Sequence, residues 1–217
     1  LVRGIFNEFN IKTVINFVAE SHVDNSILKP KLFLETNIIG TANLLEFAKS
    51  SKVNKFLQIS TDEVYGSLLE GFADEDYKFN PASPYSASKA GAEHLCNAYL
   101  KTFNLNVFVV RCSNNYGHYQ HPEKFIPKSI ISILNEEPVS VYGDGLNVRE
   151  WIHVSDCVEG IIKLVEEKPK KRIYNLSSGF HMTNLQVLKS IENIIDKKDR
   201  KSTRLNSSHT DISRMPS

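Results

Sequence analysis

Three absences narrow the classes of protein that this sequence can encode. The 217 residues contain three cysteines, Cys96, Cys112 and Cys157, and no CxxC pair, which argues against a disulfide framework or a zinc site. No apolar run approaches the roughly 18 residues of a membrane span, and no secretory signal is visible at the start. We therefore expect a soluble cytoplasmic protein without a membrane partner.

Neither sign of charge is in excess. Lysine and arginine total 26 against 25 acidic residues, and the two signs are interspersed along the chain. A nucleic acid or a membrane surface is therefore not expected as a partner, although a small anionic ligand can still be bound locally. Hydrophobic residues make up 41% and charged residues 24% of the chain, which is typical of a globular domain with a real core.

The hydrophobic pattern alternates between strands and helices. Short apolar runs rich in β-branched residues predict strands at 13–19, 55–60, 107–112 and 172–176. Helical spacing of apolar residues predicts helices within 33–48, 90–104, 157–165 and 185–194. Three of the strands are almost continuously hydrophobic, as strands covered on both faces of a parallel sheet are. The predicted class is α/β with a doubly wound parallel sheet, whose ligands bind outside the carboxyl ends of the strands.

The first candidate site is a tyrosine and lysine pair at the start of a helix. Ser83 is a good N-cap and Pro84 a good first residue, so Tyr85 and Lys89 stand one turn apart on one helix face. A neighbouring ammonium favours the tyrosinate and a nicotinamide cation adds to this effect, so Tyr85 could serve as a base near neutral pH. Taken alone, the spacing Tyr-x-x-x-Lys is a weak signal, and a solvated surface pair is the simpler interpretation.

The second candidate site is Thr61-Asp62-Glu63, directly after the strand at 55–60. Two neighbouring carboxyl groups whose environments separate their pKa values can act as acid and base in one reaction. Charged groups beyond a buried strand also carry a desolvation cost unless they are paired. Taken alone, Asp62 and Glu63 can equally begin a solvated loop in which Asp62 caps a turn.

No metal site is predicted. A metal-ligand spacing such as HExxH is not found among His22, His118, His121 and His153. The three cysteines are interpreted as small core residues, and Trp151 is interpreted as a packing residue.

Several motifs occur in one order along the chain. They are Ala19-Glu20-Ser21-His22-Val23-Asp24, residues 35–41, Thr61-Asp62-Glu63, the pair Tyr85 and Lys89, and residues 111–117, 118–124 and 141–151. In this order and spacing the sequence, from residue 1 to about 198, resembles the extended short-chain dehydrogenases. Within them it is most similar to the nucleotide-sugar 4,6-dehydratases, and among these to the enzymes that act on dTDP-glucose. The most specific element is Thr61-Asp62-Glu63, because related epimerases usually carry small or hydroxyl residues at the two acidic positions.

The resemblance implies an NAD-dependent reaction at a hexose. Tyr85 would remove the 4-hydroxyl proton while hydride leaves C4 for NAD, and Lys89 would hold the tyrosinate and the nicotinamide ribose. Thr61 would hydrogen-bond the 4-oxygen. Glu63 would then take the C5 proton, Asp62 would protonate the departing 6-hydroxyl, and hydride would return to C6 to give the 4-keto-6-deoxy sugar.

The resemblance also implies two sets of binding residues. The cofactor set is Phe17, Val18, Ala19, Glu20, Ser21, Thr36, Tyr85, Lys89 and Asn115. The substrate set is Ser21, Thr61, Asn114, Lys124, Phe125, Ser140, Val141, Tyr142 and Arg149. Cationic Lys124 and bidentate Arg149 suit a diphosphate. The implied partner is a nucleotide-diphosphate sugar, either dTDP- or UDP-linked, and a homodimer is expected through the helices bearing Thr36 and Tyr85.

One expected motif is missing. No G-x-G-x-x-G or G-x-x-G-x-x-G stands between a strand and a helix, and the ribose-binding acid is absent too. We therefore expect a partial Rossmann-type domain over 1–176 that lacks its first strands and carries a substrate-side insertion around 117–150. Residues 177–198 would begin a small substrate-binding part. Residues 199–217 would be a disordered tail, for which a sequencing or splice artefact is one explanation.

The missing phosphate cradle leaves alternatives open. The chain is either a fragment of an NAD-dependent dehydratase or a truncated, catalytically dead paralogue with at most a binding role. A nucleotide-sugar epimerase or decarboxylase of the same superfamily is a third interpretation, which the acid pair argues against. On the 217 residues alone we expect no measurable NAD binding.

Overall fold

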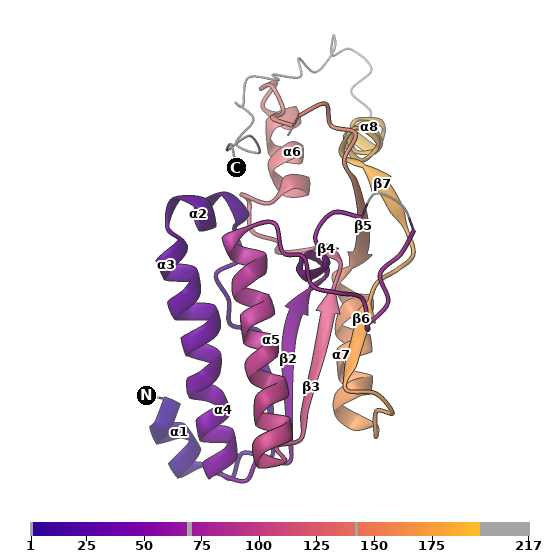
Figure 1. Ribbon diagram of the computed structural model, residues 1–217. Helices are drawn as coiled ribbons and strands as arrows, with labels where there is room; N and C mark the ends of the chain where they lie inside the picture. Colours follow the sequence, from indigo (N-terminus) through magenta and orange to yellow (C-terminus); the bar gives the residue numbers. More distant parts are fainter. Residues whose placement is uncertain (1, 69–70, 142, 196–217) are drawn as a thin grey trace. The chain divides into compact units, whose positions relative to one another are not determined.

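The computed structural model describes residues 2–68, 71–141 and 143–195 of the chain (Figure 1). Two compact units are formed, and each consists of two stretches of chain. The first unit comprises Leu1–Ser113 and Val158–Leu176, and the second comprises Asn114–Cys157 and Ser177–Ser217. The predicted domain boundaries stay a prediction, and the predicted tail at 199–217 lies outside the described residues.

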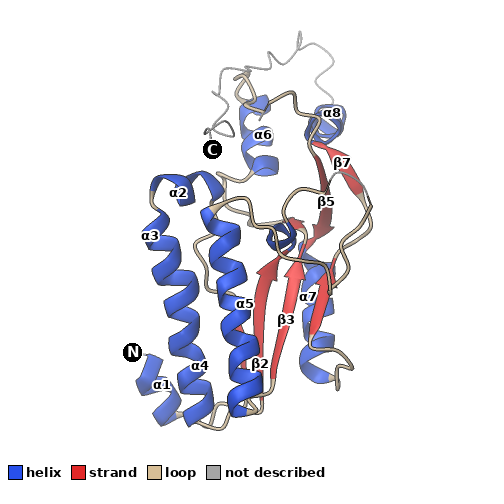
Figure 2. Ribbon diagram, viewed as in Figure 1, coloured by secondary structure: helices blue, strands red, loops and turns tan. Residues whose placement is uncertain are grey.

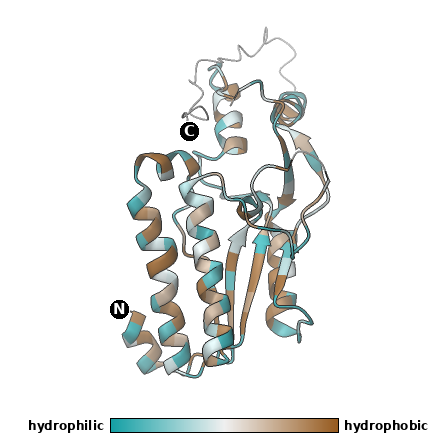
Figure 3. Ribbon diagram, in the orientation of Figure 1, coloured by the Kyte–Doolittle hydropathy of each residue, from teal (hydrophilic) through white to brown (hydrophobic). Residues whose placement is uncertain are grey.

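A parallel sheet forms the centre of the first unit. Its strands are β1 (Thr13–Asn16), β2 (Lys55–Thr61), β3 (Val107–Cys112) and β6 (Ile173–Leu176), in the order β1-β2-β3-β6. All six residues of β3 are buried, and Figure 3 shows hydrophobic colouring along most of that strand. The four predicted strands and the parallel α/β class are therefore confirmed.

The first strand is shorter than predicted, because it ends at Asn16 rather than at residue 19. The Asn16 side chain accepts a 3.1 Å hydrogen bond from the backbone N–H of Val18, which turns the chain out of the sheet. Residues 17–22 consequently form a loop at the carboxyl end of β1.

Helices cover this sheet (Figure 2). They are α1 (Val2–Glu8), α2 (Val23–Leu28), α3 (Pro30–Phe33), the π-helix η1 (Leu34–Ile39), α4 (Gly40–Ser50), α5 (Pro84–Phe103) and α7 (Val154–Glu166), of which α7 begins in the second unit. Helices α4 and α5 lie side by side and pack on the sheet. Their core contains Leu45 and Ala48 of α4, Cys96 of α5, and Phe56 and Val107 of the strands. Burial of this apolar surface fixes α5 against the sheet.

The second unit contains a smaller sheet of three strands, which the sequence pattern did not predict. Strand β4 (Asn114–Tyr116) pairs in parallel with β5 (Val148–His153), which pairs antiparallel with β7 (His181–Thr183). Helices α6 (Phe125–Leu134) and α8 (Asn184–Ile195) belong to the same unit. Trp151 packs in its core and stacks on Phe125 with ring centroids 6.2 Å apart, which confirms the packing interpretation of this residue.

Within the part of the chain that the structure describes, no helix has both the length and the apolar character needed to cross a membrane.

Candidate active site

The acid pair follows the carboxyl end of β2 without a break. Thr61 ends the strand, and Asp62 and Glu63 open the 3-10 helix η2 (Asp62–Tyr65). The Thr61 hydroxyl accepts a 3.2 Å hydrogen bond from the backbone N–H of Glu63 and donates to Asp62 Oδ1 at 3.2 Å. Thr61 is thus the cap of this turn, rather than Asp62 as the simpler interpretation of the sequence had it. The two carboxyl groups are held in a short helix and do not begin a solvated loop.

Tyr85 stands in the first turn of α5, and the start of this helix is fixed as predicted. The Ser83 hydroxyl accepts a 3.1 Å hydrogen bond from the N–H of Ser86, and the Ser86 hydroxyl accepts a 3.0 Å bond from the N–H of Ser83. This is a reciprocal capping box. The Tyr85 side chain is only 9% exposed, and its hydroxyl hydrogen-bonds the side chain of Thr61. The phenol and the acid pair therefore meet at the carboxyl end of β2.

Burial raises the pKa of Tyr85 well above its ordinary value. The negative charge of Glu63 raises this pKa further and that of Asp62 adds to the effect, whereas the hydrogen bond to Thr61 opposes it. From the sequence we expected the Lys89 ammonium to lower the pKa of Tyr85, and in this structure that expectation is wrong. Burial and two neighbouring carboxylates raise this pKa instead, so the phenol is neutral at physiological pH.

Lys89 is buried one turn further along α5. Its side chain is 4% exposed, and Nζ donates a 2.6 Å hydrogen bond to the backbone carbonyl of Ile59 in β2. Desolvation lowers the pKa of Lys89 to about 8, and the carboxylate of Glu93 acts in the opposite direction. Because Tyr85 and Lys89 are both buried, the alternative of a solvated surface pair is excluded.

The loop that follows β1 contains five of the predicted cofactor residues, and Asn37 of the π-helix holds it in place. The Asn37 side-chain oxygen accepts from the N–H of Glu20 at 2.9 Å, and its amide donates to the Glu20 carbonyl at 3.0 Å and to the Ser88 hydroxyl at 2.8 Å. Ser88 lies on α5, and it donates in turn to the Tyr85 carbonyl at 2.7 Å. The loop is therefore tied to the helix that carries Tyr85.

Beside this loop lies a cavity of about 550 Å³. Two predicted cofactor residues, Val18 and Thr36, line it together with Arg3, Asn16 and Thr41. Phe17 and Val18 are more than half exposed, so their side chains are accessible to a ligand. Ala19 and Glu20 are partly buried and Ser21 is exposed.

The other predicted binding residues lie in the second unit. Asn114 and Asn115 belong to β4, and Arg149 belongs to β5 and is exposed. Lys124 is the N-cap of α6 and Phe125 is its first residue. Ser140 is partly buried, whereas Val141 packs in the hydrophobic core of this unit. Tyr142 lies outside the described residues. The structure thus unites the predicted catalytic residues in the first unit and places this part of the substrate set in the second.

Some of the residues that lie near the site were not identified from the sequence. Asn37 is fully buried inside a π-helix, a rare element that is frequent at functional sites. Glu93 and Arg111 form a buried ion pair with 2.8 Å between Nη2 and Oε2. Two signals could have found this pair: Glu93 follows Lys89 at helical spacing, and Arg111 is a charge inside an otherwise apolar strand.

Among the described residues, no group of three or more histidine, cysteine or acidic side chains is arranged to hold a metal ion. The three cysteines are buried, as the sequence predicts.

Comparison with known proteins places these features in a family. A family profile described as GDP-mannose 4,6 dehydratase matches residues 1–215. The chain is 47% identical over 175 residues to a dTDP-glucose 4,6-dehydratase of Streptomyces griseus, with 81% of this chain and 53% of that protein covered. It is 42% identical over 205 residues to a dTDP-D-glucose 4,6-dehydratase of Dictyostelium discoideum, with 89% of this chain and 47% of that protein covered.

The chain is also similar to solved structures of nucleotide-sugar enzymes. A crystal structure of a dTDP-glucose 4,6-dehydratase from Streptomyces venezuelae with NAD and TYD bound matches with a TM-score of 0.85 at 39% identity, over 89% of this chain and 61% of that one. A UDP-glucuronic acid 4-epimerase from Bacillus cereus in complex with UDP-glucuronic acid and NAD matches with a TM-score of 0.84 at 29% identity, over 94% of this chain and 64% of that one. The chain thus spans about half the length of the curated relatives described above.

Proposed function

The chain belongs to the GDP-mannose 4,6 dehydratase family, and from this premise we propose that it carries the catalytic residues of an NAD-dependent nucleotide-sugar 4,6-dehydratase. The observation that carries the proposal is the joining of Tyr85, Thr61 and the acid pair in one hydrogen-bonded cluster at the carboxyl end of a parallel strand. Oxidation at one sugar carbon and elimination at the next require a base for each step and an acid for the leaving group. This cluster contains all three.

Tyr85 is the base for the oxidation step. Its pKa is raised by burial and by nearby carboxylates, so it needs positive charge nearby before it can accept the 4-hydroxyl proton at neutral pH. Lys89 supplies one such charge when its ammonium leaves the Ile59 carbonyl and turns to the phenol or the nicotinamide ribose. Thr61 already hydrogen-bonds the Tyr85 hydroxyl and is placed to bind the 4-oxygen of the sugar.

Asp62 and Glu63 perform the elimination. Once C4 is a ketone, the C5 proton becomes acidic, and Glu63 removes it. Asp62 protonates the 6-hydroxyl, which leaves as water. Both residues have fixed positions in η2, and Thr61 caps this turn. Each carboxyl group therefore keeps its own role as acid or base. Two carboxyl groups in one site, one acting as an acid and the other as a base, are a general pattern in enzymes.

The residues present fit the nicotinamide end of the cofactor. A buried lysine, a loop after β1 that Asn37 holds in place, and a cavity lined by Val18 and Thr36 are suited to the ribose and the nicotinamide ring. Residues 17–21, Thr36, Lys89 and Asn115 would hold NAD. When bound, NAD would accept hydride from C4 and return it to C6, while the proton taken by Glu63 would return to C5. The glycine-rich turn that binds a pyrophosphate is not among these 217 residues.

The proposed substrate is dTDP-glucose, because the relatives with 42–47% identity described above are named for it. Lys124 and Arg149 are the proposed diphosphate contacts. A second candidate is a nucleotide-sugar 4-epimerase, which the likeness to the Bacillus cereus enzyme favours. An epimerase returns hydride to C4 and needs no acid and base for elimination, so the pair Asp62 and Glu63 favours the dehydratase.

The experiment compares Glu63→Gln with wild type in the full-length gene product, supplied with NAD and dTDP-glucose. Wild type should release a product lighter by one water in mass spectrometry. Glu63→Gln should form this product at least about a hundredfold more slowly, because the base for C5 is lost. Glu8→Gln, on an exposed face of α1, is the matched control and should match wild type. A wild-type product of unchanged mass with inverted C4 would establish the epimerase, and no product at all would favour a catalytically dead paralogue.

A further inference from the structure

A buried hydrogen-bond network centred on Arg111 has no role in the proposed chemistry. Arg111 is 3% exposed and Glu93 is 4% exposed. Nε of Arg111 lies 3.0 Å from Glu93 Oε2 and Nη2 lies 2.8 Å from the same oxygen. The guanidinium thus binds the carboxylate through two nitrogen atoms, and this arrangement fixes its plane.

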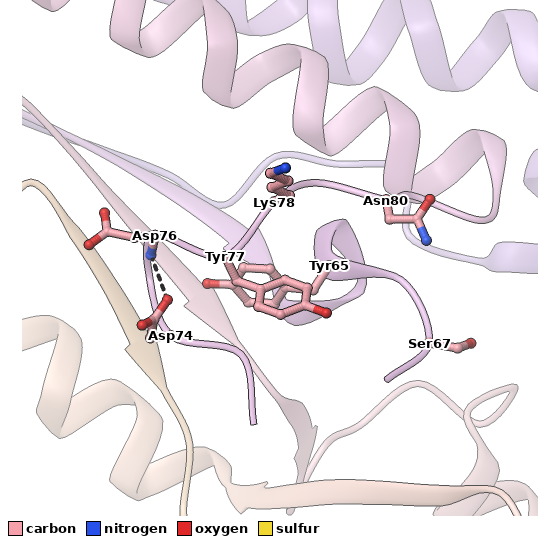
Figure 4. A pocket seen from close by; sticks show the side chains of 7 residues that line it. All are labelled: Tyr65, Ser67, Asp74, Asp76, Tyr77, Lys78 and Asn80. Carbon is pink, nitrogen blue, oxygen red and sulfur yellow. Dashed lines mark hydrogen bonds between the residues drawn. The ribbon is translucent and has the colours of Figure 1, made fainter. Parts of the chain in front are cut away.

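The opposite edge of the guanidinium holds Tyr65. Nη1 of Arg111 donates a 2.6 Å hydrogen bond to the Tyr65 hydroxyl, and this hydroxyl donates to Oδ1 of Asn175 at 2.6 Å. The guanidinium carbon also lies 4.9 Å from the centre of the Tyr65 ring. The Tyr65 ring also meets the ring of Tyr77 edge-on, with ring centroids 6.0 Å apart. Both side chains line a cavity of about 580 Å³ (Figure 4).

The two ends of this network belong to the two halves of the proposed catalytic set. Tyr65 is the last residue of η2, the short helix that carries Asp62 and Glu63. Glu93 lies on α5, one turn beyond Lys89 and two turns beyond Tyr85. The chain of contacts from Tyr65 through Arg111 to Glu93 links η2 to α5 by polar interactions, in addition to the packing of Val64 and Tyr65 on Ala90 of α5.

A second hydrogen bond connects Glu93 of α5 to β2, the strand that leads into η2. The Ser60 hydroxyl donates to Oε1 of Glu93 at 2.5 Å, and Ser60 immediately precedes Thr61. Arg111 faces Ser60 across the parallel pair of β2 and β3. Glu93 therefore receives hydrogen bonds from both strands, close to the point where each ends.

We propose that Tyr65 and Arg111 are positioning residues that set the distance between the elimination pair on η2 and the oxidation pair on α5. This inference rests on the proposed function. It predicts that loosening Tyr65 impairs proton removal at C5 more than hydride removal at C4, because Tyr85 and Lys89 stay anchored on their own helix. A network that only stabilises the fold would affect both steps equally.

The experiment uses Tyr65→Phe in the full-length gene product, with Tyr77→Phe as the control. Tyr65→Phe keeps the ring that packs on Arg111 and Tyr77 but removes the hydroxyl that joins Arg111 to Asn175. With dTDP-glucose and NAD, kcat should fall about tenfold, the free-energy equivalent of one hydrogen bond to a charged group. KM should change less than about twofold, and Tyr77→Phe should match wild type.

The isotope effects on kcat distinguish positioning from stability. In Tyr65→Phe the effect of deuterium at C5 of the sugar should rise and the effect of deuterium at C4 should fall, relative to wild type. A variant that is only less stable would lower the amount of folded enzyme and leave both isotope effects unchanged, and this result would overturn the proposal.

A measurement without substrate separates this inference from the proposed function. In the ligand-free protein, hydrogen exchange of the backbone amides of 62–66 should be faster in Tyr65→Phe than in wild type, while exchange in 85–93 stays the same. Unchanged exchange in 62–66 would overturn the positioning role even if dehydratase activity is found. Absence of dehydration by wild type would instead overturn the proposed function, and the exchange result would then still decide whether Tyr65 fixes η2.

Discussion

Lys89 donates a 2.6 Å hydrogen bond to the carbonyl of Ile59, two residues before Thr61 in the same strand. The ammonium is therefore held on the sheet, and burial together with nearby carboxylates raises the pKa of Tyr85. In the proposed mechanism, activation of the tyrosine therefore depends on charge that arrives with the cofactor and on movement of Lys89. Two predictions concern this lysine.

The first prediction is an alkaline limit to activity. Burial lowers the pKa of Lys89 to about 8, so the side chain is cationic below this pH and becomes neutral above it. Because kcat/KM reports on ionisations of the free enzyme, it should decline above about pH 8 for dTDP-glucose. In Lys89→Arg the cation persists, so whatever activity remains should show no decline until a higher pH. An unchanged alkaline limit in Lys89→Arg would assign this ionisation to another group.

The second prediction is that Lys89 lowers the stability of the fold. Its pKa is about 8 in the folded chain against an ordinary value of 10.5, so between these values the unfolded chain binds more protons and stability rises with pH. Below pH 8 the full penalty applies, about 3 kcal/mol. Lys89→Met removes this penalty but also the hydrogen bond from the charged ammonium to Ile59, worth about 1.5–3 kcal/mol. At pH 7 we therefore expect the free energy of unfolding in urea to rise by about 1 kcal/mol, with loss of activity.

The control for this experiment is Lys101→Met, an exposed lysine on the same helix. It should change the free energy of unfolding by less than about 0.5 kcal/mol. If Lys89→Met is less stable than wild type at pH 7, the buried ammonium stabilises the fold and this prediction is wrong.

Much of this site could be predicted from local pattern. The capped start of α5, and with it the spacing of Tyr85 and Lys89, follows from Ser83 and Pro84. The strands of the main sheet follow from continuous apolar runs such as 107–112. What the spacing could not predict is the pKa of Tyr85, because that value depends on burial and on carboxylates from another element. The catalytic and binding roles of individual residues stay predictions.

Other features depend on contacts between distant segments. Strands β4 and β7 have three residues each, too short for an alternating pattern to be recognised. Asn37 bonds a residue 17 positions away and another 51 positions away, and no local rule connects them. The apolar residues of its π-helix have the same spacing as those of an α-helix. The sequence therefore predicts one continuous α-helix, whereas the structure has the π-helix η1 followed by the α-helix α4.

The third prediction concerns the loop that Asn37 holds. Asn37→Ala removes three hydrogen bonds, two to Glu20 and one to Ser88, and leaves the Glu20 N–H and carbonyl without this partner. We expect a loss of about 1–3 kcal/mol in the free energy of unfolding. Because residues 17–21 are the proposed cofactor contacts, the Kd for NAD, measured by calorimetry on the full-length gene product, should rise about tenfold, equivalent to about 1.4 kcal/mol.

Asn25→Ala is the matched control, since Asn25 is an exposed asparagine in α2. It should leave NAD binding unchanged. Loss of stability in Asn37→Ala with an unchanged Kd would mean that the loop does not contact the cofactor.

The fourth prediction tests the buried ion pair of Glu93 and Arg111. Glu93→Gln leaves the Arg111 guanidinium, 3% exposed, without its counter-charge. Removing one partner of a buried pair typically costs 3–5 kcal/mol, so the free energy of unfolding should fall by about this amount. The exposed pair of Lys163 and Glu159 on α7 is the comparison, because Nζ and Oε1 lie 3.1 Å apart in solvent. Glu159→Gln should cost less than about 1 kcal/mol.

The double variant Glu93→Met with Arg111→Met then separates charge from packing. Replacing both partners by apolar side chains removes the desolvation penalty of each, so the double variant should be more stable than Glu93→Gln alone. Its kcat for dehydration should nevertheless stay at least about tenfold below that of wild type, because Tyr65 loses its hydrogen-bond donor Arg111. A double variant that regains both stability and normal turnover would show that the pair is retained for reasons unrelated to the geometry of the site.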